Sequence, residues 1–178
     1  RDQPMVWQSA AFYLSRSDFV TGAAPSTVNP ALWRQAGFNA QHGLYEVCEG
    51  IWQVRGFDIS TVTFIAGDTG WIIIDPLTTA ETARAAFALV TEHLGQRPVK
   101  AVIYTHSHVD HYGGILGVIS PEQATAGEIP IVAPEGFMAE AVSENIIAGP
   151  AMGRRAIYQF GILLPWDETG HVDTGLGK

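Results

Sequence analysis

Three histidines and one aspartate stand within six positions of one another in the stretch "VIYTHSHVDHYGG", directly after an apolar segment. His106, His108, Asp110 and His111 form an H-x-H-x-D-H pattern. Burying these side chains without partners would leave several polar atoms unpaired, which costs free energy. Since imidazole and carboxylate are the ligands that zinc takes in hydrolytic sites, the pattern predicts a metal site. We therefore expect a fold that presents this loop at the carboxyl end of a strand, where functional residues of open α/β sheets gather.

The spacing divides the four side chains into two pairs. Two positions apart in an extended loop, His106 and His108 can point to one side and share one metal ion. Asp110 and His111 follow where a helix is expected to start, and they can reach a second ion. The glycines that follow, Gly113–Gly114, let the backbone approach closely, because a bulkier residue would crowd the site.

The remaining pattern predicts an α/β order of elements. Strands are expected within residues 50–56, 61–67, 71–75, 99–105 and 129–134. Helices are expected within residues 29–39, 78–95, 135–145 and 151–161, with a further helix starting at 113–119. The segment "WIIID" is apolar throughout, which is typical of a strand covered on both faces.

Local signals fix several of these boundaries. Asn29 is expected to cap the first helix, with Pro30 at its first position. Thr78 and Glu81 match a capping box for the second helix, which Gly95 should end. Residues 67–70 are expected to form a tight turn between two antiparallel strands.

Composition narrows the class of protein. The chain has 178 residues, of which 47% are hydrophobic and 16% charged, as in a globular domain with a well-filled core. The net charge of −8 and the lack of a Lys or Arg run argue against nucleic-acid binding. No apolar run approaches the roughly 20 residues of a transmembrane segment. The single cysteine, Cys48, excludes an internal disulfide and is expected to be buried or half-buried.

Two regions follow from the change in pattern along the chain. Residues 1–49 read as an amino-terminal arm that wraps over a body or a partner subunit. Residues 50–178 read as the first part of a catalytic domain. The chain opens at Arg1, and since an export signal could have been removed, we favour a secreted or periplasmic location over the cytoplasm.

The chain resembles the amino-terminal part of the alkyl sulfatases of the metallo-β-lactamase fold. The T-H-x-H-x-D-H motif after an apolar strand, and the "GDTGWIIIDP" segment before it, are similar to the signature of that fold. The subfamily resemblance comes from segments that occur together in order: "NPALWRQ", "HGLYEV", "GIWQVRGFDIS", "DTGWIIIDPLTTAETARAA", "VIYTHSHVDHYGG", "APEGFMAEAVSEN" and "AGPAMGRRA".

The resemblance implies an αββα sandwich, of which this chain would supply roughly the first half. It implies two zinc ions, one held by His106 and His108, the other by Asp110 and His111, with a catalytic role for Asp110. Asp75 would lie behind the ligands and orient them, and the alternative is that it caps the turn after its strand. The activity implied is hydrolysis of alkyl sulfate esters, such as the detergent dodecyl sulfate, by a metal-activated water.

Four ligands are too few for two catalytic zinc ions, since one such ion normally takes three protein ligands and a water. In the resembling family the other ligands lie well downstream, so by that map they fall beyond Lys178. We therefore expect the domain to be incomplete and to continue beyond this residue or on another chain. The implied partners are the complementary carboxy-terminal portion, a second copy in a homodimer, and the substrate.

Weaker candidates lie after the cluster. Asn145, Arg154 and Arg155 are candidates for binding the substrate, the two arginines by offsetting the sulfate charge. The simpler readings are a helix end for Asn145 and surface or interface positions for the arginines. The apolar run 157–166 could line an alkyl-chain tunnel, although core packing is the default. The other histidines have simpler readings: His93 suits the end of a helix, His42 lies in the arm, and His171 lies in a polar, glycine-rich tail.

Two alternatives to the alkyl sulfatase remain open. One is a thioesterase or lactonase of the same fold. The other is a non-catalytic, metal-binding fragment of such an enzyme. The residues also leave open whether water attacks sulfur or carbon.

Overall fold

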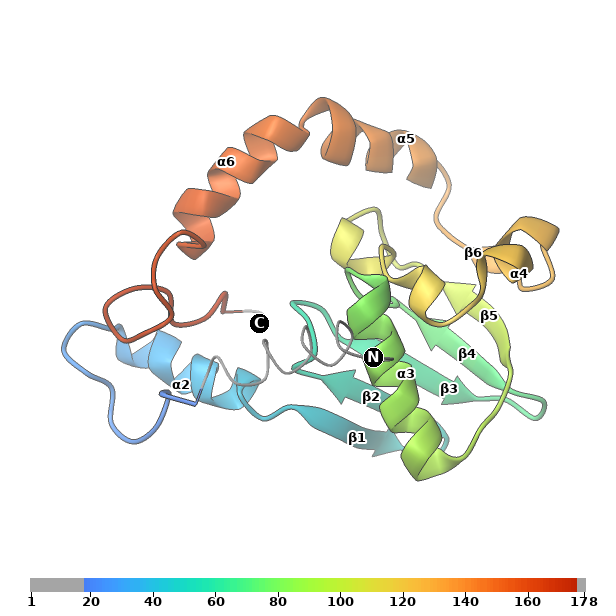
Figure 1. Cartoon of the computed structure of the whole chain (residues 1–178), viewed down its shortest axis with the longest axis horizontal. Helices are drawn as coiled ribbons and strands as arrows, with labels where there is room; N and C mark the ends of the chain where they lie inside the picture. Colours follow the sequence, from blue (N-terminus) through green and yellow to red (C-terminus); the bar gives the residue numbers. More distant parts are fainter. Residues whose placement is uncertain (1–17, 176–178) are drawn as a thin grey trace, which may run out of the picture.

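A single mixed sheet organises the chain, which a computed structural model describes for residues 18–175 (Figure 1). Its strands are β1 (Gly43–Cys48), β2 (Ile51–Arg55), β3 (Val62–Ala66), β4 (Trp71–Ile74), β5 (Val99–Ile103) and β6 (Ile131–Val132), and they lie in the sheet in chain order. The pairs from β1 to β4 are antiparallel, while β4, β5 and β6 are parallel. The expected turn between β3 and β4 is confirmed, because Gly67 N donates to Gly70 O at 2.9 Å.

Helix α3 (Ala80–Leu94) connects the parallel strands β4 and β5 and covers one face of the sheet (Figure 1). Its apolar residues recur at helical spacing and face the core, since Ala83 and Val90 are buried while Phe87 and Leu94 pack against the core. The core between helix and sheet includes Val54, Phe64, Trp71, Ile73, Val90 and Val102. In β4, Ile72 and Ile74 point to the opposite face and are only half-buried, so the prediction that this strand is covered on both faces holds for one face.

The predicted capping box at the start of α3 is wrong by one position. Thr79 is the N-cap, and its side chain accepts from Thr82 N. The hydroxyl of Thr78 instead donates to Asp58 at 2.6 Å. The end of the helix at Gly95 is as predicted.

Helix α2 (Pro30–Asn39) begins at the predicted N-cap, Asn29, whose side chain accepts from Ala31 N. Its residues Trp33 and Ala36 form a small second core with Val172 near the carboxyl end. Strand β1, which falls in the segment that we grouped with the arm, pairs with β2 at the edge of the sheet. Cys48, at the end of β1, is exposed, so its predicted burial is wrong.

The expected helix at residues 113–119 is only a short 3-10 turn, η2 (Ile115–Gly117), after the 3-10 turn η1 (Val109–His111). The short helix α4 (Pro121–Ala126) then precedes β6. Helix α5 (Phe137–Val142) passes directly into a π-helical turn, η3 (Ser143–Ile147), and α6 (Gly149–Phe160) follows.

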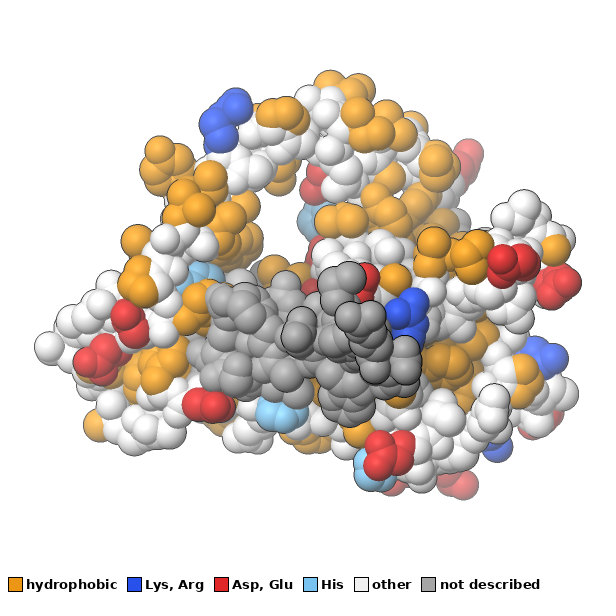
Figure 2. Space-filling model, viewed as in Figure 1, with side chains coloured by type: hydrophobic (Ala, Val, Ile, Leu, Met, Phe, Trp, Pro, Cys, Tyr) orange, Lys and Arg blue, Asp and Glu red, His pale blue; other side chains and the backbone are white. Residues whose placement is uncertain are grey.

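Residues 137–164, named the arch here, curve away from the sheet (Figure 1). Figure 2 shows hydrophobic side chains gathered along it. Its most exposed apolar residues are Met138, Ile146, Ile147, Tyr158 and Leu163. Within residues 18–175 no helix combines the length and apolarity needed to cross a bilayer.

Candidate metal centre

The predicted cluster lies where β5 ends, at the carboxyl edge of the parallel part of the sheet. The ring centroid of His106 lies 4.6 Å from that of His108 and 4.1 Å from that of His111. Asp110 Oδ2 lies 3.2 Å from His111 Nε2. The structure therefore brings all four side chains of the H-x-H-x-D-H pattern together.

Asp75 joins this group from the end of β4. Its backbone has a φ of 54°, which is rare for a residue other than glycine and often marks functional sites. The carboxylate accepts from Thr105 N at 2.8 Å and from the Thr105 hydroxyl at 2.6 Å. It also lies 2.9 Å from His111 Nδ1. Asp75, a residue that is 6% exposed, thus links the ends of β4 and β5 and fixes one ring of the cluster.

These contacts determine which ring nitrogens carry protons. A carboxylate only accepts, and Asp75 lies closer to Nδ1 of His111, at 2.9 Å, than Asp110 lies to Nε2, at 3.2 Å, so the proton of the neutral ring is placed on Nδ1. Since the Thr105 hydroxyl donates to Asp75, its oxygen accepts from Nδ1 of His106, 3.0 Å away. In the neutral rings, Nε2 of both histidines is therefore left with its lone pair.

The side chains fit a metal ion in their chemistry. Nε2 of a neutral His111 and the Asp110 carboxylate are both acceptors, and at 3.2 Å they repel unless a proton or a cation lies between them. The histidine and carboxylate donors are also those that zinc prefers. Within residues 18–175, however, no three His, Cys, Asp or Glu side chains converge on one point, so side-chain rotation is needed to complete a coordination shell.

Contacts with Ser60 and with the backbone before α3 fix the backbone of the loop that carries the cluster. Ser60, from the segment between β2 and β3, donates its hydroxyl hydrogen to the carbonyl of Asp110. A Cβ at Gly113 would lie 2.2 Å from Thr78 O, and one at Gly114 would lie 2.1 Å from Pro76 O. The two glycines therefore permit close approach, as predicted, but to the backbone before α3 rather than to the site.

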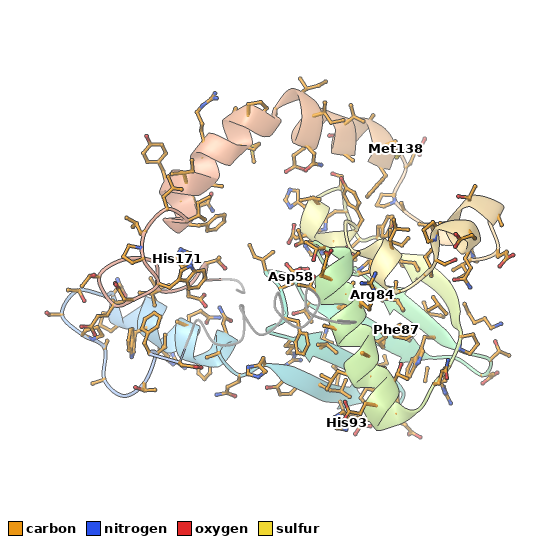
Figure 3. The ribbon with its side chains drawn as sticks, in the orientation of Figure 1. Asp58, Arg84, Phe87, His93, Met138 and His171 are labelled. Carbon is orange, nitrogen blue, oxygen red and sulfur yellow. The ribbon has the colours of Figure 1, made fainter. Side chains whose placement is uncertain are left out.

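Asp58 supports the same region, and the sequence analysis missed it. Its buried carboxylate accepts from Thr78 N, from the Thr78 hydroxyl and from the Thr82 hydroxyl, as well as from Ile59 N. Figure 3 shows Asp58 beside one end of α3, with His93 at the other end. The one signal in the sequence was the pair of threonines, which we read only as a helix start.

The weaker candidates for substrate binding, Asn145, Arg154 and Arg155, lie in η3 and α6. Asn145 lies in η3, and its Nδ2 donates to Tyr112 OH at 3.2 Å and to Ala141 O at 2.8 Å. Arg154 and Arg155 are exposed on α6, and neither pairs with another residue of the described part of the chain. In the run 157–166, Tyr158 and Ile162–Leu164 are exposed, so the default of core packing is wrong for these residues.

The environment of the cluster shifts two pKa values. Burial, and then the neighbouring rings of His111 and His108, lower the pKa of His106, although Asp75 and Asp110 oppose the shift. Burial, followed by the nearby Tyr112, raises the pKa of Tyr104 to about 12. Both groups are therefore neutral at physiological pH.

The other histidines stay outside the cluster. His93 is exposed in the last turn of α3, as predicted. His171 is not a polar tail residue: it is 3% exposed, its ring lies 4.1 Å from that of Trp166, and neither ring nitrogen has a hydrogen-bond partner among the described residues.

Comparison with known proteins places these observations in a family. The model of the metallo-beta-lactamase superfamily matches residues 55–178. The chain is 54% identical over 153 residues to the alkyl/aryl-sulfatase BDS1 of Saccharomyces cerevisiae, covering 86% of this chain and 24% of that protein. It is 48% identical to an (R)-specific secondary-alkylsulfatase of a Pseudomonas species, covering 98% of this chain and 26% of that protein.

A solved structure agrees with this likeness. The stereoselective inverting sec-alkylsulfatase Pisa1 of a Pseudomonas species matches 93% of this chain and 26% of its own, with a TM-score of 0.87 and 49% identity. The predicted α/β fold of the metallo-β-lactamase type is thereby confirmed. The chain spans about a quarter of the length of the curated relatives that it matches.

Proposed function

Because this chain belongs to the metallo-beta-lactamase superfamily, we propose that it supplies part of the active site of a zinc-dependent alkyl sulfatase. The reaction is the hydrolysis of an alkyl sulfate ester, such as dodecyl sulfate, to an alcohol and sulfate. The observation that carries the proposal is the group of three imidazoles and a carboxylate at the end of β5, in a chain about half identical to alkylsulfatases.

His106 and His108 would hold one zinc ion, while Asp110 and His111 would contribute to the second. Zinc ions bound there would supply positive charge to the sulfate oxygens and increase the acidity of a water molecule. The chain's own contribution is to fix the donors. Asp75 keeps the proton of His111 on Nδ1, and through Thr105 it does the same for His106.

The arch offers candidate groups for the substrate. The exposed apolar residues Ile162–Leu164 are available to an alkyl chain. The exposed cations Arg154 and Arg155 remain our candidates for offsetting the charge of the sulfate group, which hydrolysis must accommodate.

We further propose that the remaining ligands come from the complementary carboxy-terminal portion and that the enzyme is a homodimer. Mass spectrometry of the intact sample tests this composition. A companion species of comparable or larger mass, with about two zinc ions per assembled site, is expected from the two-metal mechanism. A lone species of 19.2 kDa without metal would contradict the proposal.

The activity is tested with the zinc-loaded protein that contains this chain, by measuring sulfate release from dodecyl sulfate and turnover of an acyl thioester. Sulfate release is expected. Replacing His108 with Ala should abolish it and lower the zinc content, whereas His93→Ala, a histidine at the exposed end of α3, should change neither. Thioester turnover without sulfate release would favour the thioesterase alternative.

The bond that breaks is tested by hydrolysis in ¹⁸O-labelled water. Pisa1 is described as inverting, and inversion requires attack at carbon with cleavage of the C–O bond. From the 49% identity we expect the label in the alcohol and inverted configuration in a chiral secondary alcohol. Label in the sulfate with retained configuration would indicate attack at sulfur instead.

A further inference from the structure

The π-helical turn η3 brings two side chains of the arch to the loop that carries the cluster. In η3, Ala148 N donates to Ser143 O at 2.9 Å, five positions back. Single π-helical turns are rare and are often found at functional sites. Glu144 Oε1 lies 3.2 Å from His108 Nε2, and Asn145 Nδ2 lies 3.2 Å from Tyr112 OH. The arch therefore contacts the cluster loop through adjacent polar residues.

His108 differs from the other two histidines in what fixes its ring. Asp75 and Thr105, at the ends of β4 and β5, fix the rings of His111 and His106. The side chain of His108 is 57% exposed, and within residues 18–175 its one charged side-chain partner is Glu144, at ion-pair distance from Nε2. Its orientation thus depends on an element far along the chain.

The chemistry of this contact determines which nitrogen of His108 is free. The Glu144 carboxylate only accepts, so it favours a proton on Nε2 and leaves the lone pair on Nδ1. The two nitrogens point to roughly opposite sides of an imidazole ring. Glu144 consequently lies on the far side of the ring from the nitrogen that can bind a metal.

We propose that Glu144 is a positioning residue, which accepts from Nε2–H of His108 so that Nδ1 is the nitrogen presented to zinc. This inference rests on the proposed function in one respect, that His108 is a zinc ligand. Metal-binding histidines commonly donate their second ring N–H to a carboxylate, and loss of such partners typically lowers metal affinity about 10–100-fold. Through Glu144, the arch would thereby influence how tightly His108, in the loop after β5, binds zinc.

The first test needs no metal and no activity. In the metal-free full chain at about pH 8, neutral imidazoles report their tautomer through the two ring ¹⁵N chemical shifts. We expect His108 to be almost wholly Nε2-protonated in the wild type. In Glu144→Ala the two shifts should move toward each other, because both tautomers become populated. Glu140→Ala removes an exposed carboxylate from the preceding helix and should leave the shifts of His108 unchanged.

The second test is zinc affinity, measured by competition with a chromophoric chelator. Glu144→Ala should weaken binding about 10–100-fold without changing the number of ions bound. Glu144→Gln retains an acceptor oxygen and should lose less than Glu144→Ala, while Glu140→Ala should match the wild type.

Two results would overturn the proposal: unchanged His108 shifts and zinc affinity in Glu144→Ala, or the loss of a whole zinc ion, which would make Glu144 a ligand. A wild-type protein that contains both this chain and its complementary portion, yet binds no zinc, would instead count against the proposed function, and the tautomer measurement would still decide the role of Glu144.

Discussion

Helix α3 and helix α6 illustrate two different relations between sequence and burial. Both are amphipathic, and α6 is the more strongly amphipathic of the two. Yet α3 buries Thr82, Ala83, Ala86 and Val90 against the sheet, whereas α6 buries no residue. An apolar stripe thus shows which face of a helix can be buried. Whether that face packs against the sheet depends on the segments that connect the helix to its neighbours. The body, residues 43–119, packs around a shared core, whereas in the arch only Ala141 is buried and Phe137 packs against that core.

The largest effect should come from removing the Asp58 carboxylate, which links the start of α3 to the segment between β2 and β3 by hydrogen bonds. Asp58→Ala removes four hydrogen bonds and leaves Thr78 N without its acceptor, while the Thr82 hydroxyl keeps only its longer contacts with Thr79. We expect a loss of about 3–4 kcal/mol in the free energy of unfolding. Chemical denaturation measures it, with Asp68→Ala, in the exposed turn between β3 and β4, as the control. Equal stability of the two variants would contradict a supporting role for Asp58.

A smaller but still large contrast is expected between glycines of the two regions. In Gly114→Ala the new Cβ would meet Pro76 O at 2.1 Å, so the backbone must shift and about 2–3 kcal/mol should be lost. Gly153 lies inside α6 with no atom within 4 Å of a new Cβ. Gly153→Ala should therefore stabilise the helix by about 0.5–1 kcal/mol. Thermal unfolding of both variants would reveal whether the contrast has the predicted sign.

The same substitution in each region sharpens the comparison further. Ile73 in β4 is fully buried, and Ile73→Val should cost about 1 kcal/mol. Ile147 in the arch is 76% exposed, and Ile147→Val should change stability by less than about 0.5 kcal/mol. A comparable loss at both positions in denaturant titrations would mean that the arch is buried in solution.

The smallest effect concerns the pH dependence of the cluster. The pKa of His106 in the folded chain lies below its ordinary value, so the unfolded chain binds a proton more readily. The resulting stability is complete above about pH 6.5 and decreases as the pH falls below that value. NMR titration of the metal-free chain should give a His106 midpoint below about 6.5. His106→Gln should flatten the loss of stability at acidic pH.

Much of the fold was predictable because its signals are local. The turn at residues 67–70, the N-cap Asn29 and the apolar face of α3 each depend on residues close together in the chain. The start of α3 was misplaced by one residue for the opposite reason: the hydroxyl of Thr78 is taken by Asp58, 20 positions away. The π-helical turn was likewise not visible, since no residue pattern distinguishes it from the helix that it continues.

The candidate site divides in the same way. The H-x-H-x-D-H pattern is compact enough to read directly, and resemblance to a family pointed to Asp75. Ser60 and Glu144 carried no comparable signal, because each becomes meaningful only when the fold places it beside Asp110 or His108. In the sequence, nothing distinguishes these two residues from the serines and glutamates found on most protein surfaces.

The chain-order arrangement of the strands has a consequence for synthesis. As the polypeptide emerges from the ribosome, each strand can join the edge of a sheet that already exists, without waiting for a distant partner. Asp58, Ser60 and Asp75 all leave the ribosome before the cluster that they support. The residues that support the loop with its three histidines are therefore synthesised before the loop itself, and Glu144 is synthesised after it.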